Sequence, residues 1–218
     1  MVTAEKWLSI VENYSNTIWP AQIIFYIVAL LITGRVLLKP TNLSIKFLNL
    51  YFVVVFAWNG ILWYFTLAKD MAGDSYGNYF FGAIFLAVSV LFAIDIFRRK
   101  MRFRLPVDGW QRYIAITLLV LVFCYPLLGM IGGHDVSRLM YPGTYPCPTV
   151  ALGIVMLVTT LPKVDIILYM LLLFLAIPFT PFIQIHRYNV YEDIVLFVSG
   201  VYGLIMYLRG KINRTQIR

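Results

Sequence analysis

The chain alternates between long apolar runs and short polar segments. Most of the runs extend for about twenty residues, which is the length that an α-helix needs to cross the roughly 30 Å hydrocarbon core of a bilayer. The pattern predicts an all-α integral membrane protein, built as a bundle of about seven transmembrane helices. The predicted spans are residues 19–38, 46–67, 78–97, 113–131, 148–162, 164–184 and 190–208.

The fifth and sixth predicted spans are less regular than the others. The fifth would be only about 22 Å long if straight, and a single residue, Lys163, separates its closing Pro162 from the next run. Residues 148–184 could therefore form two full spans or a re-entrant hairpin whose irregular backbone is shielded by protein. Both alternatives leave the orientation of the remaining spans unchanged.

The apolar runs divide the chain into three parts. Residues 1–17 are predicted to be an extracytoplasmic N-terminal tail or interfacial helix, and residues 18–208 the transmembrane helical domain. Residues 209–218 are predicted to be a basic cytoplasmic tail. Pro20 is expected at the start of the first span, where its missing backbone donor has no helical partner to lose.

Composition agrees with a lipid environment. Hydrophobic residues make up 61% of the 218-residue chain and charged residues 13%, and the mean hydropathy is +0.81. A soluble domain of this size and composition would have too few polar residues to cover its surface. We expect the protein to be integral to the cell membrane, either the plasma membrane or the inner membrane.

The distribution of positive charge predicts the orientation. Short cytoplasmic loops of membrane proteins are enriched in Lys and Arg. With the N-terminus outside, alternate segments would place fourteen of the eighteen basic residues on the cytoplasmic side, which also holds the C-terminus. The net charge of +8 is thus explained by orientation, and no nucleic-acid partner is predicted.

A basic cluster follows the third predicted span. It could bind anionic lipid headgroups, at about 1 kcal/mol per side chain, or serve only to fix orientation. The cluster consists of Arg98, Arg99, Lys100, Arg102 and Arg104. A second copy of the chain or other membrane subunits are further candidate partners.

The common signatures of membrane enzymes are absent, so no catalytic residues and no enzymatic activity are predicted. The sequence has no H-E-x-x-H or G-x-S-x-G motif, no Gly-rich phosphate loop and no pair of carboxylates in mid-span. The acidic residues near span ends have structural interpretations. Asp95 is expected to pair with the following arginines, whereas Asp165, Glu192 and Asp193 are expected to cap helix starts.

The segment from residue 124 to residue 149 is the most informative for function. Pro126 is expected to kink the fourth span. The following loop should bring His134, Met140 and Cys147 near one membrane face, on the side where His186 is also predicted. Imidazole, thiolate and thioether groups suit soft ions such as Cu(I), so His134 and Cys147 are candidate metal ligands. The alternative is a solvated histidine and a cysteine that only packs.

Four short motifs in this segment resemble the signature of an uncharacterised prokaryotic membrane protein family. They are Y-P-L-L-G at Tyr125–Gly129, G-H at Gly133 and His134, Y-P at Tyr141 and Pro142, and P-C-P-T at Pro146–Thr149. The resemblance would cover nearly the whole chain, and some family members have been loosely labelled permeases. It implies that His134, Cys147 and Thr149 belong to a shared site.

The leading hypothesis is a transporter or channel-like permease for a small solute or ion. Prolines at positions 126, 148, 178 and 181 interrupt helices, as in transporters whose binding sites lie at broken helices. An outward-facing site around His134 and Cys147 is predicted, and its other candidate residues are Tyr125, Met140, Thr149 and His186. The alternative is a non-catalytic accessory or scaffold subunit of a membrane complex, because no ionisable pathway is visible in the sequence.

Overall fold

The computed structural model describes residues 3–67, 75–105 and 109–215, and in this part of the chain the regular structure is helical without a strand. Lys69 and Arg218, which contribute to the predicted charge distribution, lie outside the described residues. The helices are α1 (Ala4–Leu38), α2 (Asn42–Trp58), α3 (Ser75–Arg98), α4 (Gly109–Phe123), α5 (Tyr125–Ile131), α6 (Pro146–Val158), α7 (Ile166–Ala176), α8 (His186–Tyr188) and α9 (Ile194–Thr215). Two π-helical segments, Asn59–Leu67 and Thr180–Ile185, and two 3-10 turns, Val136–Arg138 and Tyr191–Asp193, complete the described elements.

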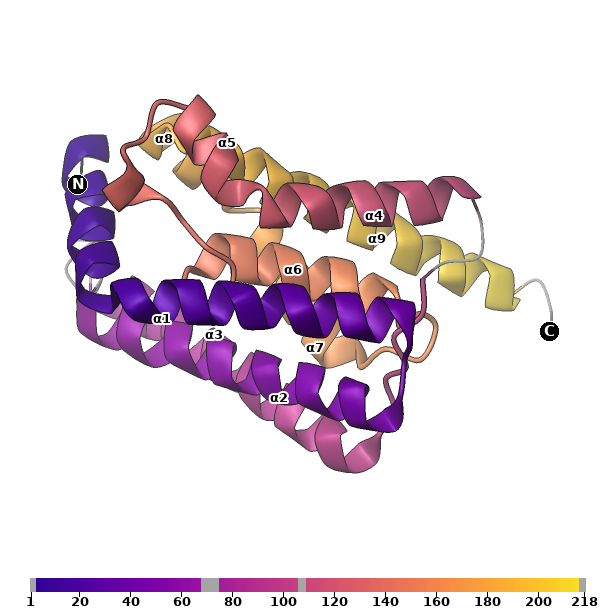
Figure 1. Cartoon of the computed structure of the whole chain (residues 1–218). Helices are drawn as coiled ribbons and strands as arrows, with labels where there is room; N and C mark the ends of the chain where they lie inside the picture. The colour runs from indigo at the N-terminus through magenta and orange to yellow at the C-terminus, as the bar shows by residue number, and fades with distance from the viewer. Residues whose placement is uncertain (1–2, 68–74, 106–108, 216–218) are drawn as a thin grey trace.

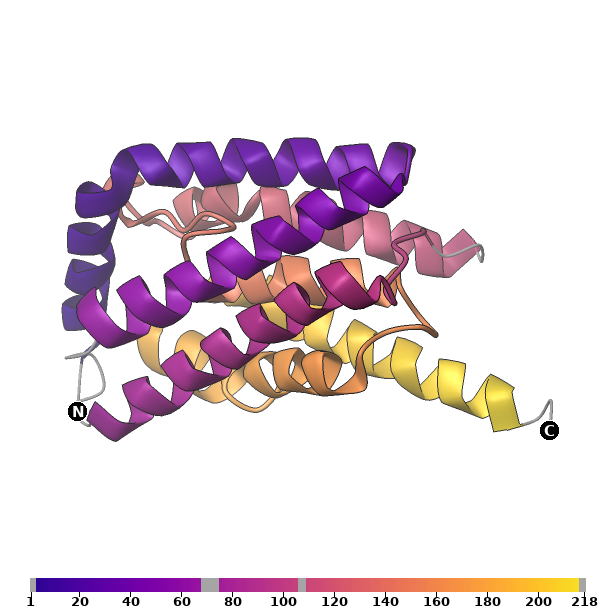
Figure 2. The ribbon, with the colours of Figure 1, turned by 90° about the horizontal axis from the view of Figure 1, so that it is seen from below.

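The long elements run back and forth along one axis (Figure 1). The first turns of α1, α5 and α8 lie at one end of the bundle, which we call the α8 end. The end of α1 and the start of α4 lie at the opposite end, toward which α9 also runs; we call this the basic end. Figure 2 shows α1, α2 and α3 side by side on one flank, where α2 packs against both neighbours.

Helix α6 forms the centre of the bundle. It packs against α2, α4, α7 and α9, and every one of its residues except Cys147 is buried. A helix that is apolar around its whole circumference is stable only when it is enclosed on all sides, and the sequence P-C-P-T-V-A-L-G-I-V-M-L-V meets that condition. At 13 residues it is about 20 Å long.

Only part of the predicted set of spans has the length of a transmembrane helix. Four helices are long and apolar enough to cross a membrane, and the bent pair α4 and α5 would make a fifth. The shorter apolar helices Pro146–Val158 and Ile166–Phe182 fall below a full span. Length and composition therefore support four or five spans, and the expected seven full-length helices are not supported.

The outer surface of the bundle is strongly apolar. Large hydrophobic side chains are exposed along α1, α2, α3 and α4, among them Ile24, Leu31, Phe47, Phe80 and Val90. Soluble monomers rarely expose apolar patches of more than a few hundred Å². This surface is compatible with insertion into a membrane.

The start of the first helix differs from the prediction. Helix α1 begins at Ala4, where the hydroxyl of Thr3 caps it by accepting from the backbone N–H of Lys6. Pro20 therefore lies inside the helix instead of at its start. A proline in a helix interior removes a backbone hydrogen bond and bends the helix, and Figure 1 shows α1 turning sharply in its N-terminal part.

The predicted kink in the fourth span is confirmed. Helices α4 and α5 meet at Cys124 at an angle of 66°. Pro126 lies in the first turn of α5, and its missing N–H cannot continue the hydrogen-bond ladder from α4. The kink directs α5 and the following loop over the α8 end of the bundle (Figure 1).

Two of the predicted roles for acidic residues can be compared directly with the structure. Asp165 caps α7 as expected, because its Oδ1 accepts from the backbone N–H groups of Ile167 and Leu168. Asp95 differs from expectation: it accepts from the Asn49 side chain at 2.9 Å and from the backbone N–H groups of residues 100 and 101. Arg99 has a φ of 51°, which turns the chain back so that these amides reach the carboxylate.

Candidate functional site

The segment from Tyr141 to Tyr145 is folded into the bundle and fixed there by its backbone. The Asn59 side chain donates to the carbonyl of Gly143 at 3.0 Å, and the Tyr14 hydroxyl donates to the carbonyl of Thr144 at 2.9 Å. Gly143 has a φ of +102°, and a Cβ there would lie only 2.5 Å from the Tyr51 hydroxyl. Only glycine can occupy this position without displacing its neighbours.

The other side of this segment is held by α1. The Tyr145 hydroxyl donates to the carbonyl of Val11 at 3.0 Å and lies 2.6 Å from the Ser15 hydroxyl. Gln22 donates to the same serine oxygen at 3.2 Å. All of these polar atoms are buried, so each hydrogen bond avoids a desolvation penalty of about 1–3 kcal/mol. The N-terminal half of α1 is thereby tied to the entrance of α6.

A pair of buried carboxylates lies beside this segment. Glu192 and Asp193 occupy the 3-10 turn before α9 and are 4% and 0% exposed. The Nδ1 atom of His134 lies 3.0 Å from Oε1 of Glu192, and the Tyr125 hydroxyl donates to Oδ1 of Asp193. The Cys147 thiol lies next to the same aspartate. We call these five residues the carboxylate cluster.

The cluster is built by bringing α5 close to the start of α9. The backbone N–H of His134 donates to the carbonyl of Gly129 at 3.0 Å. A Cβ on Gly129 would lie 3.2 Å from Oε1 of Glu192 and 3.3 Å from the Leu139 side chain. Gly129 therefore permits the close approach of α5 to the turn that carries Glu192.

Charge at the rim of the cluster is largely balanced. The neighbouring Glu192 carboxylate raises the pKa of His134 above its ordinary value, although partial burial and the positive charge of Arg138 oppose the shift. Arg138 itself pairs with Glu12 of α1 at 3.0 Å and lies 4.0 Å from Asp135. The loop between α5 and α6 is thus joined to α1 by an ion pair as well.

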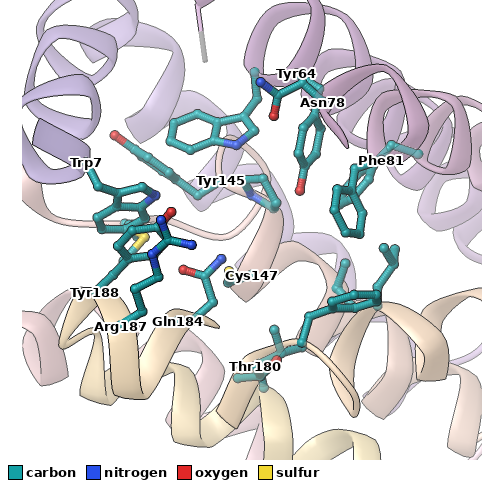
Figure 3. A pocket seen from close by; sticks show the side chains of 18 residues that line it. Trp7, Tyr64, Asn78, Phe81, Tyr145, Cys147, Thr180, Gln184, Arg187 and Tyr188 are labelled. Carbon is teal, nitrogen blue, oxygen red and sulfur yellow. The ribbon is translucent and has the colours of Figure 1, made fainter. Parts of the chain in front are cut away.

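A cavity of about 220 Å³ opens beside Cys147 at the α8 end (Figure 3). Trp7 of α1 stacks on Tyr188 of α8 with ring centroids 5.3 Å apart, and the Arg187 guanidinium lies over the same tyrosine ring. Aromatic residues are the largest group in the lining, namely Trp7, Trp63, Tyr64, Phe81, Phe85, Tyr145, Phe179 and Tyr188. Asn78, Thr180, Gln184 and Arg187 are polar, and Met140, Pro146, Val150, Leu175 and Leu196 add further apolar surface. Cys147 both lines this cavity and belongs to the carboxylate cluster.

Comparison with known proteins places the chain in a family. A family model described as a family of unknown function (DUF6064) matches residues 4–217. The chain belongs to this family. No curated protein and no solved structure matches it. The expected kinship with an uncharacterised family is confirmed at this level, and because DUF6064 has no assigned activity, function has to be argued from the site.

The structure brings together some of the residues that the sequence singled out in this DUF6064 protein. Tyr125, His134 and Cys147 meet in the carboxylate cluster, and Met140 lines the cavity. Thr149 has a positioning role, because its hydroxyl oxygen accepts from the backbone N–H of residue 143 at 2.8 Å. The sixth candidate, His186, has an exposed side chain on α8.

A metal centre receives no support from the described residues. Within residues 3–67, 75–105 and 109–215, no group of three or more His, Cys, Asp and Glu side chains is arranged to hold a metal ion. His134 and Cys147 instead contact different members of the carboxylate pair. The soft-ion interpretation is therefore not carried further.

Sequence reasoning missed the central pair of the site. Glu192 and Asp193 were expected to cap the seventh span, but both side chains turn inward and are buried against α5 and α6 residues. An available signal was their adjacency at the start of an apolar run. An N-cap is a single position, so capping explains at most one of two neighbouring acids.

Proposed function

We propose that this DUF6064 protein is a small membrane transporter or channel-like permease, whose binding site is the aromatic cavity beside Cys147. The observation that carries the proposal is the cavity at the α8 end, which has a buried ionisable cluster directly behind its wall. Ionisable side chains buried among apolar helices are costly and commonly mark solute or ion pathways. A cavity of about 220 Å³ fits a small solute.

The proposed membrane topology has seven crossings, with the N-terminus outside. The alternating direction of α1, α2, α3, the bent pair α4 and α5, α6, α7 and α9 supports this count (Figure 1). Helices α6 and α7 are short, but α6 is enclosed by protein, so its ends need not reach the lipid headgroups themselves.

The basic end is proposed to face the cytoplasm, so that the cavity opens outward. A pocket of about 440 Å³ at this end is lined by Arg102, Arg104 and Lys163. Basic pockets between helices on the cytoplasmic side attract anionic lipid headgroups, which supports the predicted interaction with such lipids. Native mass spectrometry after mild delipidation should find fewer retained anionic lipids on the Arg102→Gln, Arg104→Gln variant than on the wild type.

The transport proposal is tested by flux and by access to Cys147. In a Cys124→Ser background, a membrane-impermeant thiosulfonate reagent added from outside should label Cys147 and reduce the uptake of small solutes into proteoliposomes. A Cys147→Ser variant that retains Cys124 is the matched control, and the reagent should leave its uptake unchanged.

A contrary outcome would favour a scaffold. If a panel of small cations, anions and neutral solutes enters proteoliposomes no faster than empty liposomes, transport is excluded for that panel. Recovery of stoichiometric membrane partners on purification in mild detergent would then indicate an accessory subunit, as the large exposed apolar surface would also allow.

A further inference from the structure

We propose that the carboxylate cluster is a proton-binding site, in which Glu192 and Asp193 share one exchangeable proton that is linked to the occupancy of the neighbouring cavity. The link to the cavity rests on the proposed transport function. The proton site itself rests on the burial, contacts and charge of the five residues.

The charge of the cluster leads to this proposal. With both carboxylates ionised and His134 protonated, the cluster carries a net charge of −1. Its other two members, Tyr125 and Cys147, are neutral donors. An uncompensated charge is expensive in a buried site, and the uptake of one proton brings the net charge to zero.

Groups on the surrounding elements do not remove this imbalance. Tyr64 lies near Asp193, but its hydroxyl carries no charge, and the guanidinium of Arg187 beside the cavity lies over the Tyr188 ring. Arg138 lies near His134, but it is engaged by Glu12 of α1 at 3.0 Å and lies 4.0 Å from Asp135. The pair formed by Arg138 and Glu12 is itself neutral, so it adds no positive charge to the cluster. The cluster therefore depends on a proton for neutrality.

Unused hydrogen-bonding capacity marks where the proton would be held. Both carboxylate oxygens of Glu192 and Oδ2 of Asp193 are buried, and in the part of the chain that the structure describes none of the three has a hydrogen-bond partner. A protonated carboxyl group becomes a donor, so a proton on either acid would add a donor to a site whose carboxylate oxygens are short of partners. Paired carboxylates in one site commonly share a proton because two negative charges close together repel each other.

The contacts of the cluster also connect the carboxylate pair to solution through His134 and to the cavity through Cys147. The His134 side chain is 10% exposed and touches Glu192, so it can pass a proton between solution and the buried pair. At the other side, Cys147 lies between Asp193 and the cavity. Protonation of the carboxylate pair therefore changes the electrostatic potential at the part of the cavity wall that Cys147 forms.

Infrared difference spectroscopy of the full chain in lipid nanodiscs tests the proton site without any solute. Between about pH 5 and pH 9, the wild type should lose the C=O stretching band of a protonated carboxylic acid. That band should be absent or strongly reduced in both Glu192→Gln and Asp193→Asn, which keep the shape of the side chains. Asp165→Asn, at an N-cap that asparagine also fills well, is the control and should retain it.

A third variant covers the case in which the isosteric variants fold poorly. His134→Gln removes the positive charge next to Glu192 and should move the midpoint of the wild-type band upward by about one pH unit or more. A wild type without a titrating carboxylic acid band, or a band unchanged in all three cluster variants, would overturn the proposal.

The two proposals fail in distinguishable ways. If the band behaves as expected but no solute flux is detected, the proton site stands and the transport function is wrong. If flux is present but is independent of a pH gradient and no band titrates, transport stands and the proton site is wrong. Flux that accelerates with an inward proton gradient, and loses this acceleration in Asp193→Asn, would support both.

Discussion

At the scale of single residues, Gly129 controls how closely α5 approaches the carboxylate cluster. The Cβ of an alanine would lie 3.2 Å from Oε1 of Glu192 and 3.3 Å from Leu139, both tighter than ordinary van der Waals contact. Overpacking of a well-packed site costs about 1–3 kcal/mol, which should outweigh the gain of up to about 1 kcal/mol from replacing a helical glycine. We expect Gly129→Ala to lower the melting temperature in detergent.

The matched control is Gly34→Ala in α1. A Cβ there has no atom within 4 Å apart from its own helix and chain neighbours, so only the helix propensity changes. This variant should be as stable as the wild type or slightly more stable. Equal melting temperatures for the two variants would contradict the close approach of α5 to Glu192.

His134 makes the stability of the protein depend on pH. Because Glu192 raises its pKa in the folded protein, protonation of His134 stabilises the fold. This contribution is fully present below the unfolded pKa of about 6.5 and is lost as the pH rises through the higher folded value. The melting temperature should therefore fall over this range in the wild type.

His134→Gln should remove the contribution of His134 to this slope, so that only the carboxylate pair contributes to the slope that remains. His186→Gln is the control, because the exposed His186 side chain on α8 is not a member of the cluster. Thermal unfolding measured in steps across about pH 5.5 to 8.5 compares the two. If both variants kept the slope of the wild type, the stabilising role of the contact with Glu192 would be disproved.

At the scale of elements, the buried segment between α5 and α6 is held by few but well-placed hydrogen bonds. Asn59 donates to the carbonyls of Val55 and Gly143, so Asn59→Ala leaves a buried carbonyl of the segment without its donor. The expected cost is about 1–3 kcal/mol. Thermal unfolding and limited proteolysis between α5 and α6 should both report a loosened segment.

Thr66→Ala is a suitable comparison for Asn59→Ala. Within the described residues, the Thr66 hydroxyl is exposed and donates to carbonyls of its own helical segment, and water can replace such a bond. This variant should stay within about 0.5 kcal/mol of the wild type. Similar proteolysis rates for the two variants would argue against the anchoring role of Asn59.

Local features of the elements could be predicted from the sequence, whereas contacts between distant segments could not. Pro126 and Asp165 act through backbone groups within one turn, and both behave as expected. Glu192 and Asp193 are buried by partners from α5 and α6, and the Tyr125 contact spans 68 positions of the chain. Neither periodicity nor charge reveals such a partner, so the acids were assigned to capping.

The lengths of the helices show the same limit. Apolar runs occupy most of residues 148–184, so hydropathy leaves two full spans and a re-entrant hairpin as alternatives. The structure ends α6 at Val158 and begins α7 at Ile166. The apolar circumference of α6 indicates that the helix is enclosed, but a helix surrounded by lipid has the same pattern, so the sequence does not show that other helices enclose it.

At the scale of the whole molecule, the basic end should face the cytoplasm. Arg35 in the last turn of α1, Lys163 before α7 and Arg209 near the end of α9 belong to the same end of the bundle, as the positive-inside rule requires. A reporter enzyme that is active only in the cytoplasm should be active when fused to the C-terminus. Activity of a periplasm-specific reporter at that position would reverse the proposed orientation and place the cavity on the inner face.

The position of the carboxylate pair in the chain has a consequence for biosynthesis. Tyr125 and His134 enter the membrane region well before the turn that carries Glu192 and Asp193 has been synthesised. Until that turn and α9 are made, His134 and Tyr125 lack the carboxylates that they contact in the folded protein. Helix α9 and the turn before it therefore complete the packing of the bundle. We expect a nascent chain released before α9 is made to keep these polar groups unpaired and to be degraded by the proteases that remove incomplete membrane proteins.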